Sequence, residues 1–113
     1  EAAPAQDGEV YTALFSCVGP GGMSASLVQC FSQSSIKVRR GNRSRVYSIQ
    51  DLYSAAGPND SVKIGLPTSF QIEAMNSAPF DAIVLSLTIT ETATGKVLYE
   101  DQAARWRWIK VKN

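Results

Sequence analysis

The chain has 113 residues, of which 44% are hydrophobic and 19% charged, and its formal net charge is +1. A chain of this length can form one core, because it buries roughly two-thirds of the surface that it exposes when unfolded. Its composition is too apolar for a disordered protein, and it lacks the large positive excess that nucleic-acid-binding domains carry. We therefore expect a small globular domain that binds no nucleic acid.

The first residues, EAAPAQDG, are small and polar. We predict a disordered N-terminal tail at residues 1–8, followed by a single β-sandwich domain at residues 9–113. Such a start is typical of a mature chain from which a signal peptide or lipid-attachment segment has been removed, although artificial trimming would give the same start. No apolar run approaches the roughly 20 residues that span a bilayer, so we expect no transmembrane segment.

The next two segments contain both cysteines. Residues 9–18 (EVYTALFSCV) predict a strand with apolar side chains on both faces, which ends at the turn 19–22 (GPGG). Residues 23–31 (MSASLVQCF) fit a short helix or a strand, and we favour a strand because it would place Cys30 opposite Cys17 across a hairpin. An even pair of cysteines in a small domain indicates a disulfide, worth about 3 kcal/mol at this spacing. A disulfide predicts an extracytoplasmic location, in a bacterial periplasm or secreted.

The middle of the chain predicts a hairpin and one short helix. Residues 35–40 (SIKVRR) alternate between apolar and polar side chains, and residues 43–47 return as the second arm after a Gly-Asn turn. Residues 48–56 predict the helix, with Ser48 as its N-cap and Asp51 as the reciprocal partner. A Gly-Pro pair after this segment stops the helix.

The rest of the chain predicts further short strands. They are residues 61–66, 69–75, 80–92, 97–100 and 104–112. The third has the clearest alternation and places Leu85 and Leu87 in the core. Residues 76–79 (NSAP), which precede it, predict a turn.

Seven or eight short strands at about ten-residue spacing are typical of an antiparallel sandwich or a small barrel. We predict a mainly β fold, an antiparallel β-sandwich with one short helix near residues 48–56. The pattern resembles the broad class of immunoglobulin-like or transthyretin-like secreted sandwiches. A resemblance at that level does not determine function.

The residue types argue against catalysis. The chain has no histidine, which removes the commonest general base, and a disulfide would remove both thiols as nucleophiles. The ten acidic residues are scattered, and the adjacent pair Glu100-Asp101 fits a solvated turn. Two cysteines without histidine are too few for a metal site. We expect no enzyme, no catalytic residue, no metal and no cofactor.

Positive charge gathers in two segments, which hold nine of the eleven basic residues. These are Lys37, Arg39, Arg40, Arg43 and Arg45 in the hairpin, and Arg105, Arg107, Lys110 and Lys112 near the C-terminus. If the hairpin lies near the last strand, they form one basic surface that attracts anionic partners. Alternatively, they are solvated strand faces and edge protection. Arg40 and Arg43 flank the hairpin turn, so we expect both side chains to stay in water.

Trp106 and Trp108 are two residues apart, so in a strand they share a face with Lys110 and Lys112. One possibility, which we favour, is that at least one tryptophan lies in the core. The other is an exposed aromatic and basic strip that stacks on sugar rings or on the side chains of a partner.

These features predict a non-enzymatic, exported binding module that engages another protein of an envelope or secreted system. The alternative is a domain that binds an anionic polymer or a glycan through the basic and aromatic strip. The candidate binding residues are the nine basic residues named above, together with Trp106 and Trp108.

Overall fold

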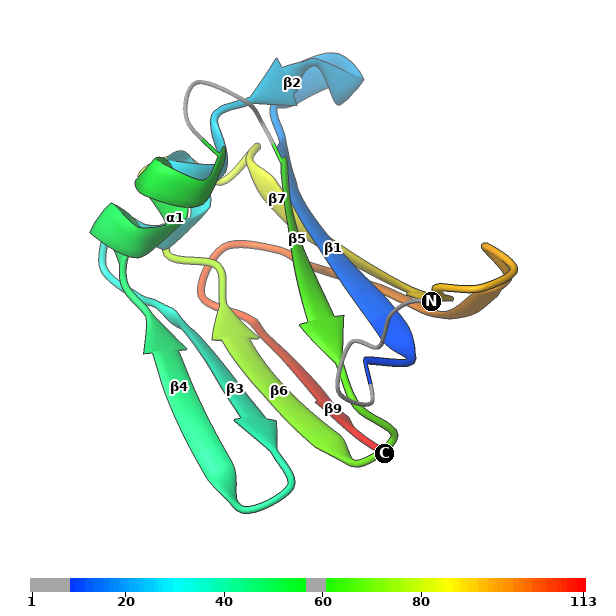
Figure 1. Ribbon diagram of the computed structural model, residues 1–113. Helices are drawn as coiled ribbons and strands as arrows, with labels where there is room; N and C mark the ends of the chain where they lie inside the picture. Colours follow the sequence, from blue (N-terminus) through cyan, green and yellow to red (C-terminus); the bar gives the residue numbers. More distant parts are fainter. Residues whose placement is uncertain (1–8, 57–60) are drawn as a thin grey trace.

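Two antiparallel β-sheets pack against each other as a β-sandwich (Figure 1). The computed structural model describes residues 9–56 and 61–113. The predicted tail, residues 1–8, and the predicted Gly-Pro stop at residues 57–58 lie outside the described residues. Apart from one strand of two residues, eight strands form in the described part. The predicted fold class, a mainly β antiparallel sandwich with one short helix, is therefore confirmed.

The first sheet has five strands, which are β1 Tyr11–Val18, β2 Ser24–Ala25, β5 Ser61–Leu66, β7 Val84–Glu91 and β8 Val97–Ala103. β1 lies at its centre and pairs with β7 along one side and with β5 and β2 along the other. β8 pairs with β7 and forms an edge. The central position of β1 agrees with the apolar side chains on both of its faces.

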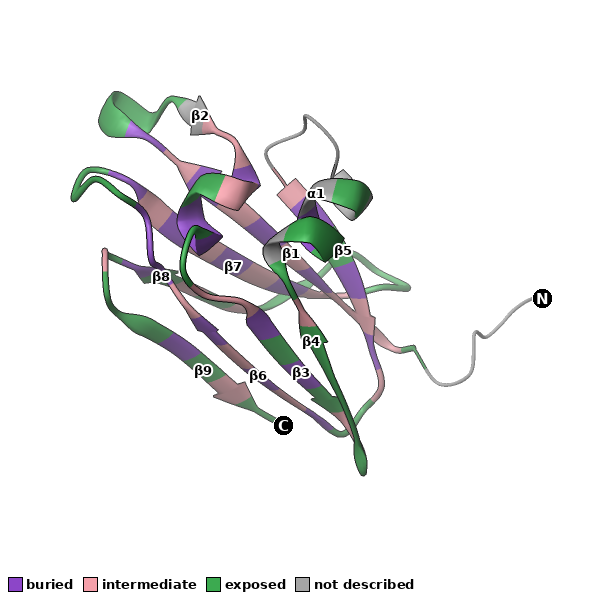
Figure 2. Ribbon diagram, turned by 90° about the vertical axis from the view of Figure 1, so that its left-hand side faces the viewer, coloured by how far each residue is buried: buried purple, intermediate pink, exposed green. Residues whose placement is uncertain are grey.

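The second sheet has four strands, which are β3 Ile36–Arg40, β4 Arg43–Tyr47, β6 Phe70–Met75 and β9 Trp108–Lys112. Their order is β4-β3-β6-β9, so the basic hairpin and the last strand belong to one sheet with β6 between them. Its two edges are β4 and β9. Figure 2 shows buried residues alternating with exposed ones along β3 and with half-buried ones along β6, whereas β4 is largely exposed.

The residues that face inward from the two sheets form one connected cluster of buried side chains. Leu85 and Leu87 of β7 are fully buried, as the alternation of this segment predicts. Ile72 of β6 and Ile109 of β9 are also fully buried and come from the opposite sheet. The core is thus filled from both layers, and the second face of each strand remains available to solvent.

The helix α1, Ile49–Ala56, follows β4 and lies next to the 3-10 helix η3, Leu27–Phe31. Its predicted cap is confirmed: Ser48 N–H and Ser48 Oγ each lie 3.1 Å from Asp51 Oδ2, and Asp51 N–H donates back to Ser48 Oγ. The hydrogen bond from the Ser48 backbone is the main reason why the pKa of the Asp51 carboxyl is lowered, and the Ser48 hydroxyl and the Arg45 charge lower it further.

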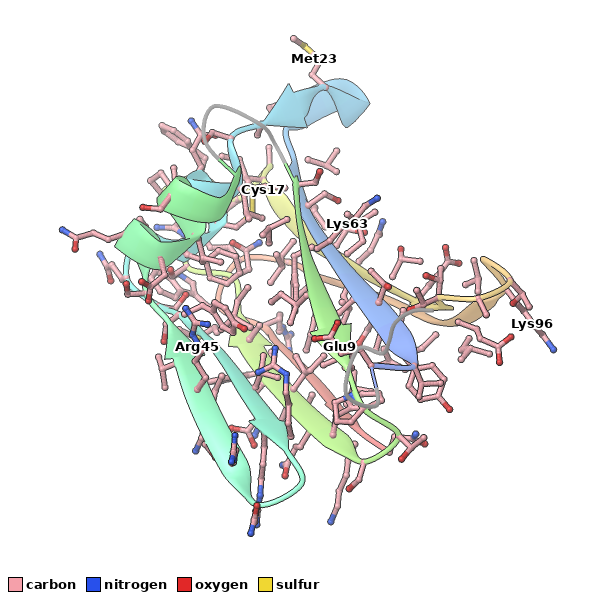
Figure 3. The ribbon with its side chains drawn as sticks, viewed as in Figure 1. Glu9, Cys17, Met23, Arg45, Lys63 and Lys96 are labelled. Carbon is pink, nitrogen blue, oxygen red and sulfur yellow. A yellow bond between two sulfur atoms is a disulfide. The ribbon has the colours of Figure 1, made fainter. Side chains whose placement is uncertain are left out.

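Cys17 and Cys30 form the predicted disulfide, with Cα atoms 6.0 Å apart (Figure 3). The strand favoured at residues 23–31 is wrong, because only β2 is extended there and η3 follows it. The buried side chains of η3 are Leu27, Cys30 and Phe31. Their spacing of three and four residues brings them to one face of a helical turn. The bridge therefore joins the end of β1 to a helical turn instead of crossing a hairpin.

The turn after β6 contains a buried asparagine that contacts both sheets. Asn76 is fully buried, and its side-chain Nδ2 donates to the carbonyl oxygens of Ile83 at 2.8 Å and of Ala103 at 2.9 Å. Its Oδ1 accepts a hydrogen bond from the Ala78 N–H, and its own carbonyl accepts one from the Trp106 N–H at 2.7 Å. Asn76 thus joins the end of β6 to the start of β7, the end of β8 and the turn before β9.

Candidate functional site

The outer face of the β4-β3-β6-β9 sheet gathers basic side chains from two distant segments. In the strand register, Lys37 of β3 lies opposite Glu73 of β6, which lies opposite Lys110 of β9. The two lysines are therefore two strand spacings apart, roughly 10 Å. The exposed residues that we call the cationic face are Lys37, Arg39, Trp108, Lys110 and Lys112. The predicted proximity of the hairpin and the last strand thus holds for these five residues.

The acid on this face is Glu73, and it accepts a hydrogen bond from Gln71 Nε2 at 3.2 Å. Arg105 and Asp81 make the one ion pair among the described residues, at 3.0 Å. The four cations of the face consequently form no ion pair with another described residue. Four positive charges around one carboxylate give this face a positive potential, which raises the local concentration of anions.

Trp108 is 53% exposed and Trp106 is 47% exposed, so the favoured burial of at least one tryptophan in the core is wrong. β9 begins only at Trp108, and its inward positions are taken by Ile109 and Val111. Trp106 lies in the preceding turn, where its φ of 67° departs from an extended strand.

Each exposed tryptophan lies beside a cation, because the Lys110 Nζ is 5.1 Å from the Trp108 ring centroid. The Arg105 Cζ lies 5.2 Å from the ring centroid of Trp106. An ammonium or guanidinium at this distance is attracted by the electrons of the ring face. An aromatic and basic strip is therefore present on β9, as the second possibility predicted, although Trp106 lies beyond the strand itself.

The other three basic residues of the hairpin point away from the cationic face. Arg40 has the same parity as the buried Ile36 and Val38, so its side chain turns toward the first sheet. The expectation that Arg40 stays in water is wrong, since it is half-buried. Its Nε donates to the Gly65 carbonyl at 3.2 Å, and its second guanidinium nitrogen donates to the Tyr47 hydroxyl at 2.9 Å. Arg40 therefore links the two sheets and is not free to bind a partner.

Arg43 and Arg45 share the parity of Arg40 across the β3–β4 hairpin, but both are exposed. The Arg45 Cζ lies 4.4 Å from the centroid of the Tyr47 ring, and Figure 3 shows Arg45 on β4 below α1. These two residues lie on the side of the hairpin opposite Lys37. The predicted basic cluster is thus divided between two faces of one sheet.

The remaining two predicted residues lie at the turn before β9. Arg105 pairs with Asp81, and Arg107 is exposed with its carbonyl accepting a hydrogen bond from the Asn76 N–H at 3.1 Å. Neither shares the strand face of Lys110. Of the eleven predicted residues, five therefore lie together on the cationic face, and the structure places the other six elsewhere.

A groove between the edge strands of the two sheets has no counterpart in the sequence prediction. It has a volume of about 190 Å³ and lies between the start of β8 and the end of β9. Its apolar lining comes from five strands and consists of Tyr11, Phe70, Ile89, Leu98, Tyr99 and Val111. The sequence gives only a weak indication of this groove, namely the two apolar residues Val97 and Leu98 at the start of β8. In the structure, about half of the surface of each is exposed.

Tyr99 brings a polar group to the wall of this groove. Burial raises the pKa of its phenol, and so do the hydrogen bond and the negative charge of Asp101. The Tyr99 hydroxyl lies 3.1 Å from Asp101 Oδ2 and donates to it. The phenol therefore remains a hydrogen-bond donor throughout the physiological pH range.

Comparisons of the chain with protein-family models, with curated proteins and with solved structures give no match. Within residues 9–56 and 61–113, no group of three or more cysteine, aspartate or glutamate residues is placed to hold a metal ion. No helix in the described part of the chain has the length and hydrophobicity to cross a membrane. The surfaces described above are therefore the grounds on which a function can be argued.

Proposed function

We propose that this protein is a non-enzymatic binding module that engages an acidic surface of another protein through its cationic face. One observation carries the proposal. Residues 37–39 and 108–112, which are far apart in the sequence, present four cations and an exposed tryptophan on one face of one sheet. Exposed tryptophan and arginine are enriched at protein interfaces, where their large side chains supply much of the binding energy.

The disulfide supports an extracytoplasmic setting for this module, either a bacterial periplasm or the outside of the cell. Disulfides form and persist in oxidising compartments and are rare in the cytosol. The Cys17–Cys30 bridge fixes η3 against the end of β1, away from the cationic face. It can therefore stabilise the scaffold without taking part in binding.

A second candidate function is the binding of an anionic polymer or a glycan. The observation that favours it is the pair of Trp108 and Lys110, since an exposed indole stacks on sugar rings while the neighbouring ammonium pairs with sulfate or carboxylate groups. Retention on immobilised heparin that falls steeply with salt is expected from this function.

Two charge reversals on the same hairpin test the proposal. Lys37→Glu with Arg39→Glu removes cations from the cationic face, and Arg43→Glu with Arg45→Glu makes the same change in net charge on the opposite side. A partner captured by the unaltered protein from an extracytoplasmic extract of the host should be lost by the first double variant and retained by the second. Equal loss with both would show that net charge, and not this face, governs binding.

The same two variants distinguish the two functions. If the first double variant loses its retention on heparin and the unaltered protein captures no polypeptide, the anionic polymer is the better assignment. If polypeptide capture depends on Lys37 and Arg39 while heparin retention is weak, the protein partner is the better assignment. Unfolding in urea controls for folding, because exposed charges contribute about 0–1 kcal/mol per pair to stability.

A further inference from the structure

The outward edge of β9 has unpaired backbone groups. β9 is the last strand in its sheet, and β6 is its one neighbour there. Phe70 and Asn113 exchange both backbone hydrogen bonds, which fixes the alternation along the two strands. Every second residue of β9 therefore bonds to β6, and the residues between direct their N–H and C=O groups away from it. Those with outward backbone groups are Trp108, Lys110 and Lys112.

The groove described above lies directly beside this edge. Its lining includes Val111 and Lys112 from β9, and Leu98 and Tyr99 from β8 in the other sheet. A further strand beside β9 would direct every second side chain toward this groove, and the intervening side chains toward the solvent beside Lys110. The edge and the groove can therefore be occupied by one extended segment.

The other edge of the same sheet lacks this combination. β4 is exposed on both faces, apart from the partly buried Tyr47. The groove described above lies at β9, on the opposite edge of this sheet from β4. The two edges therefore differ in the apolar surface that an added strand would bury.

Charge selects the kind of segment that fits. The outward face of β9 carries Lys110 and Lys112, and Lys37 lies on the same face on β3, beyond β6. Acidic residues at the outward positions of an added strand would therefore pair favourably with these lysines. A second copy of this chain fits poorly, since antiparallel pairing of β9 with itself about Lys110 would set that lysine opposite its symmetry mate. Like charges directly opposite each other destabilise a strand pair.

We propose that β9 accepts an extended segment of a partner protein as an additional strand, in which acidic residues alternate with apolar ones. The proposal rests on the proposed function and specifies how the acidic partner is held. Backbone hydrogen bonds to Trp108, Lys110 and Lys112 align the segment. Its acidic side chains face the lysines, and its apolar side chains enter the groove lined by Leu98 and Val111. Strand addition of this kind gives affinity through the backbone and specificity through alternate side chains.

Two synthetic peptides of identical composition test the alternation. One has four Glu-Val repeats and the other has four glutamates followed by four valines, both with blocked ends. We expect the alternating peptide to bind about tenfold more tightly, since only it can pair with β9 while directing acids outward and valines inward. On its binding, the amide protons of Lys110 and Lys112 should exchange with solvent at least about tenfold more slowly, as hydrogen-bonded amides do.

A matched pair of variants isolates the backbone contact. Lys110→Ala removes the charge and keeps the N–H, whereas Lys110→Pro removes both. Because Lys110 lies in a non-hydrogen-bonded pair with Glu73, its N–H makes no bond to β6, and proline is tolerated at such edge positions. We expect Lys110→Pro to bind the alternating peptide about tenfold more weakly than Lys110→Ala, as the loss of one hydrogen bond predicts.

The outcomes separate this proposal from the proposed function. Equal binding of both peptides, or equal affinities of the two Lys110 variants, would leave a cationic face that attracts acids without strand addition. The same conclusion would follow if no peptide protected the β9 amides while Lys37→Glu with Arg39→Glu still lost the captured partner. Protection of these amides that rises with protein concentration alone would assign the edge to a second copy and overturn the proposal. If Lys110→Pro does not fold, amide exchange in the unaltered protein decides.

Discussion

Replacing Asn76 by alanine should be among the most destabilising single changes in this protein. The substitution removes two donors and one acceptor, and it leaves the carbonyls of Ile83 and Ala103 and the N–H of Ala78 without their partners. All three residues are at least 96% buried. A net contribution of about 1 kcal/mol for each hydrogen bond gives a loss of about 3 kcal/mol, within a total stability of about 5–15 kcal/mol.

Asn76→Asp keeps the shape of the side chain and makes the loss depend on pH. Its carboxyl would be buried and would face two carbonyl oxygens, and these two effects outweigh the single hydrogen bond from the Ala78 N–H, which favours the charged form. The pKa of the carboxyl in the folded state should therefore lie above the unfolded value of about 3.9. A group whose pKa is raised in the folded state makes its full contribution to stability at pH values below the unfolded pKa. This contribution is lost as the pH rises through the folded pKa. At pH 3 the protonated carboxyl has one donor where the amide has two, so the variant should be less stable than the unaltered protein by about 1 kcal/mol. At pH 7 the loss of stability should be clearly larger.

Urea unfolding with the disulfide intact, followed by tryptophan fluorescence and by circular dichroism, measures these differences. The two probes should give coincident transitions if unfolding is two-state. A loss below about 1 kcal/mol for Asn76→Ala would show that water replaces the side chain and that the count of lost hydrogen bonds overstates the cost. A pH-independent difference for Asn76→Asp would contradict the burial of its carboxyl.

Two further predictions concern the second sheet and its helix. Arg40→Met should cost about 1–2 kcal/mol in urea unfolding because it removes hydrogen bonds to Gly65 and Tyr47, while Arg43→Met, on the other side of the same turn, should change stability by less than about 0.5 kcal/mol. Ser48→Ala removes the hydroxyl donor and should therefore raise the pKa of Asp51 toward its ordinary value in an NMR titration. A lowered carboxyl pKa favours folding at pH values above the unfolded pKa, and this contribution is lost on acidification. With a smaller shift, the helix cap of the variant should weaken less as the solution is acidified. An unchanged pKa would assign the shift to the Ser48 backbone N–H and the Arg45 charge.

The strands with strict alternation could be predicted from the sequence, because the face on which a residue lies is a local property of an extended chain. β3, β5 and β7 are examples, and the burial of Leu85 and Leu87 follows from it. The strand favoured at residues 23–31 is wrong because a hairpin is not the only arrangement that places Cys30 near Cys17. A helical turn satisfies the same distance between Cys17 and Cys30.

The candidate site was predictable only in part, because the sequence pattern shows which residues of one strand share a face but not which strands lie side by side. That Lys37 and Arg39 share a face is local, whereas their place in one sheet with Lys110 depends on β6 entering between two segments distant in sequence. Arg40 carries a local signal of burial in the sequence, since it shares the parity of the two buried residues Ile36 and Val38. The groove has no local signal of this kind, because its walls are assembled from five strands.

The central position of β1 has a consequence for the order in which the chain folds. Ser16 pairs with Ser61 and Tyr11 pairs with Glu91, so β1 precedes its long partners by many tens of residues. Synthesis at roughly 5–20 residues per second leaves its apolar faces without those partners for seconds. The Cys30 thiol, 13 residues beyond Cys17, emerges far sooner. Oxidation can therefore attach the end of β1 to η3 before the first sheet exists, whereas in reducing conditions β1 lacks this attachment until β5 and β7 arrive.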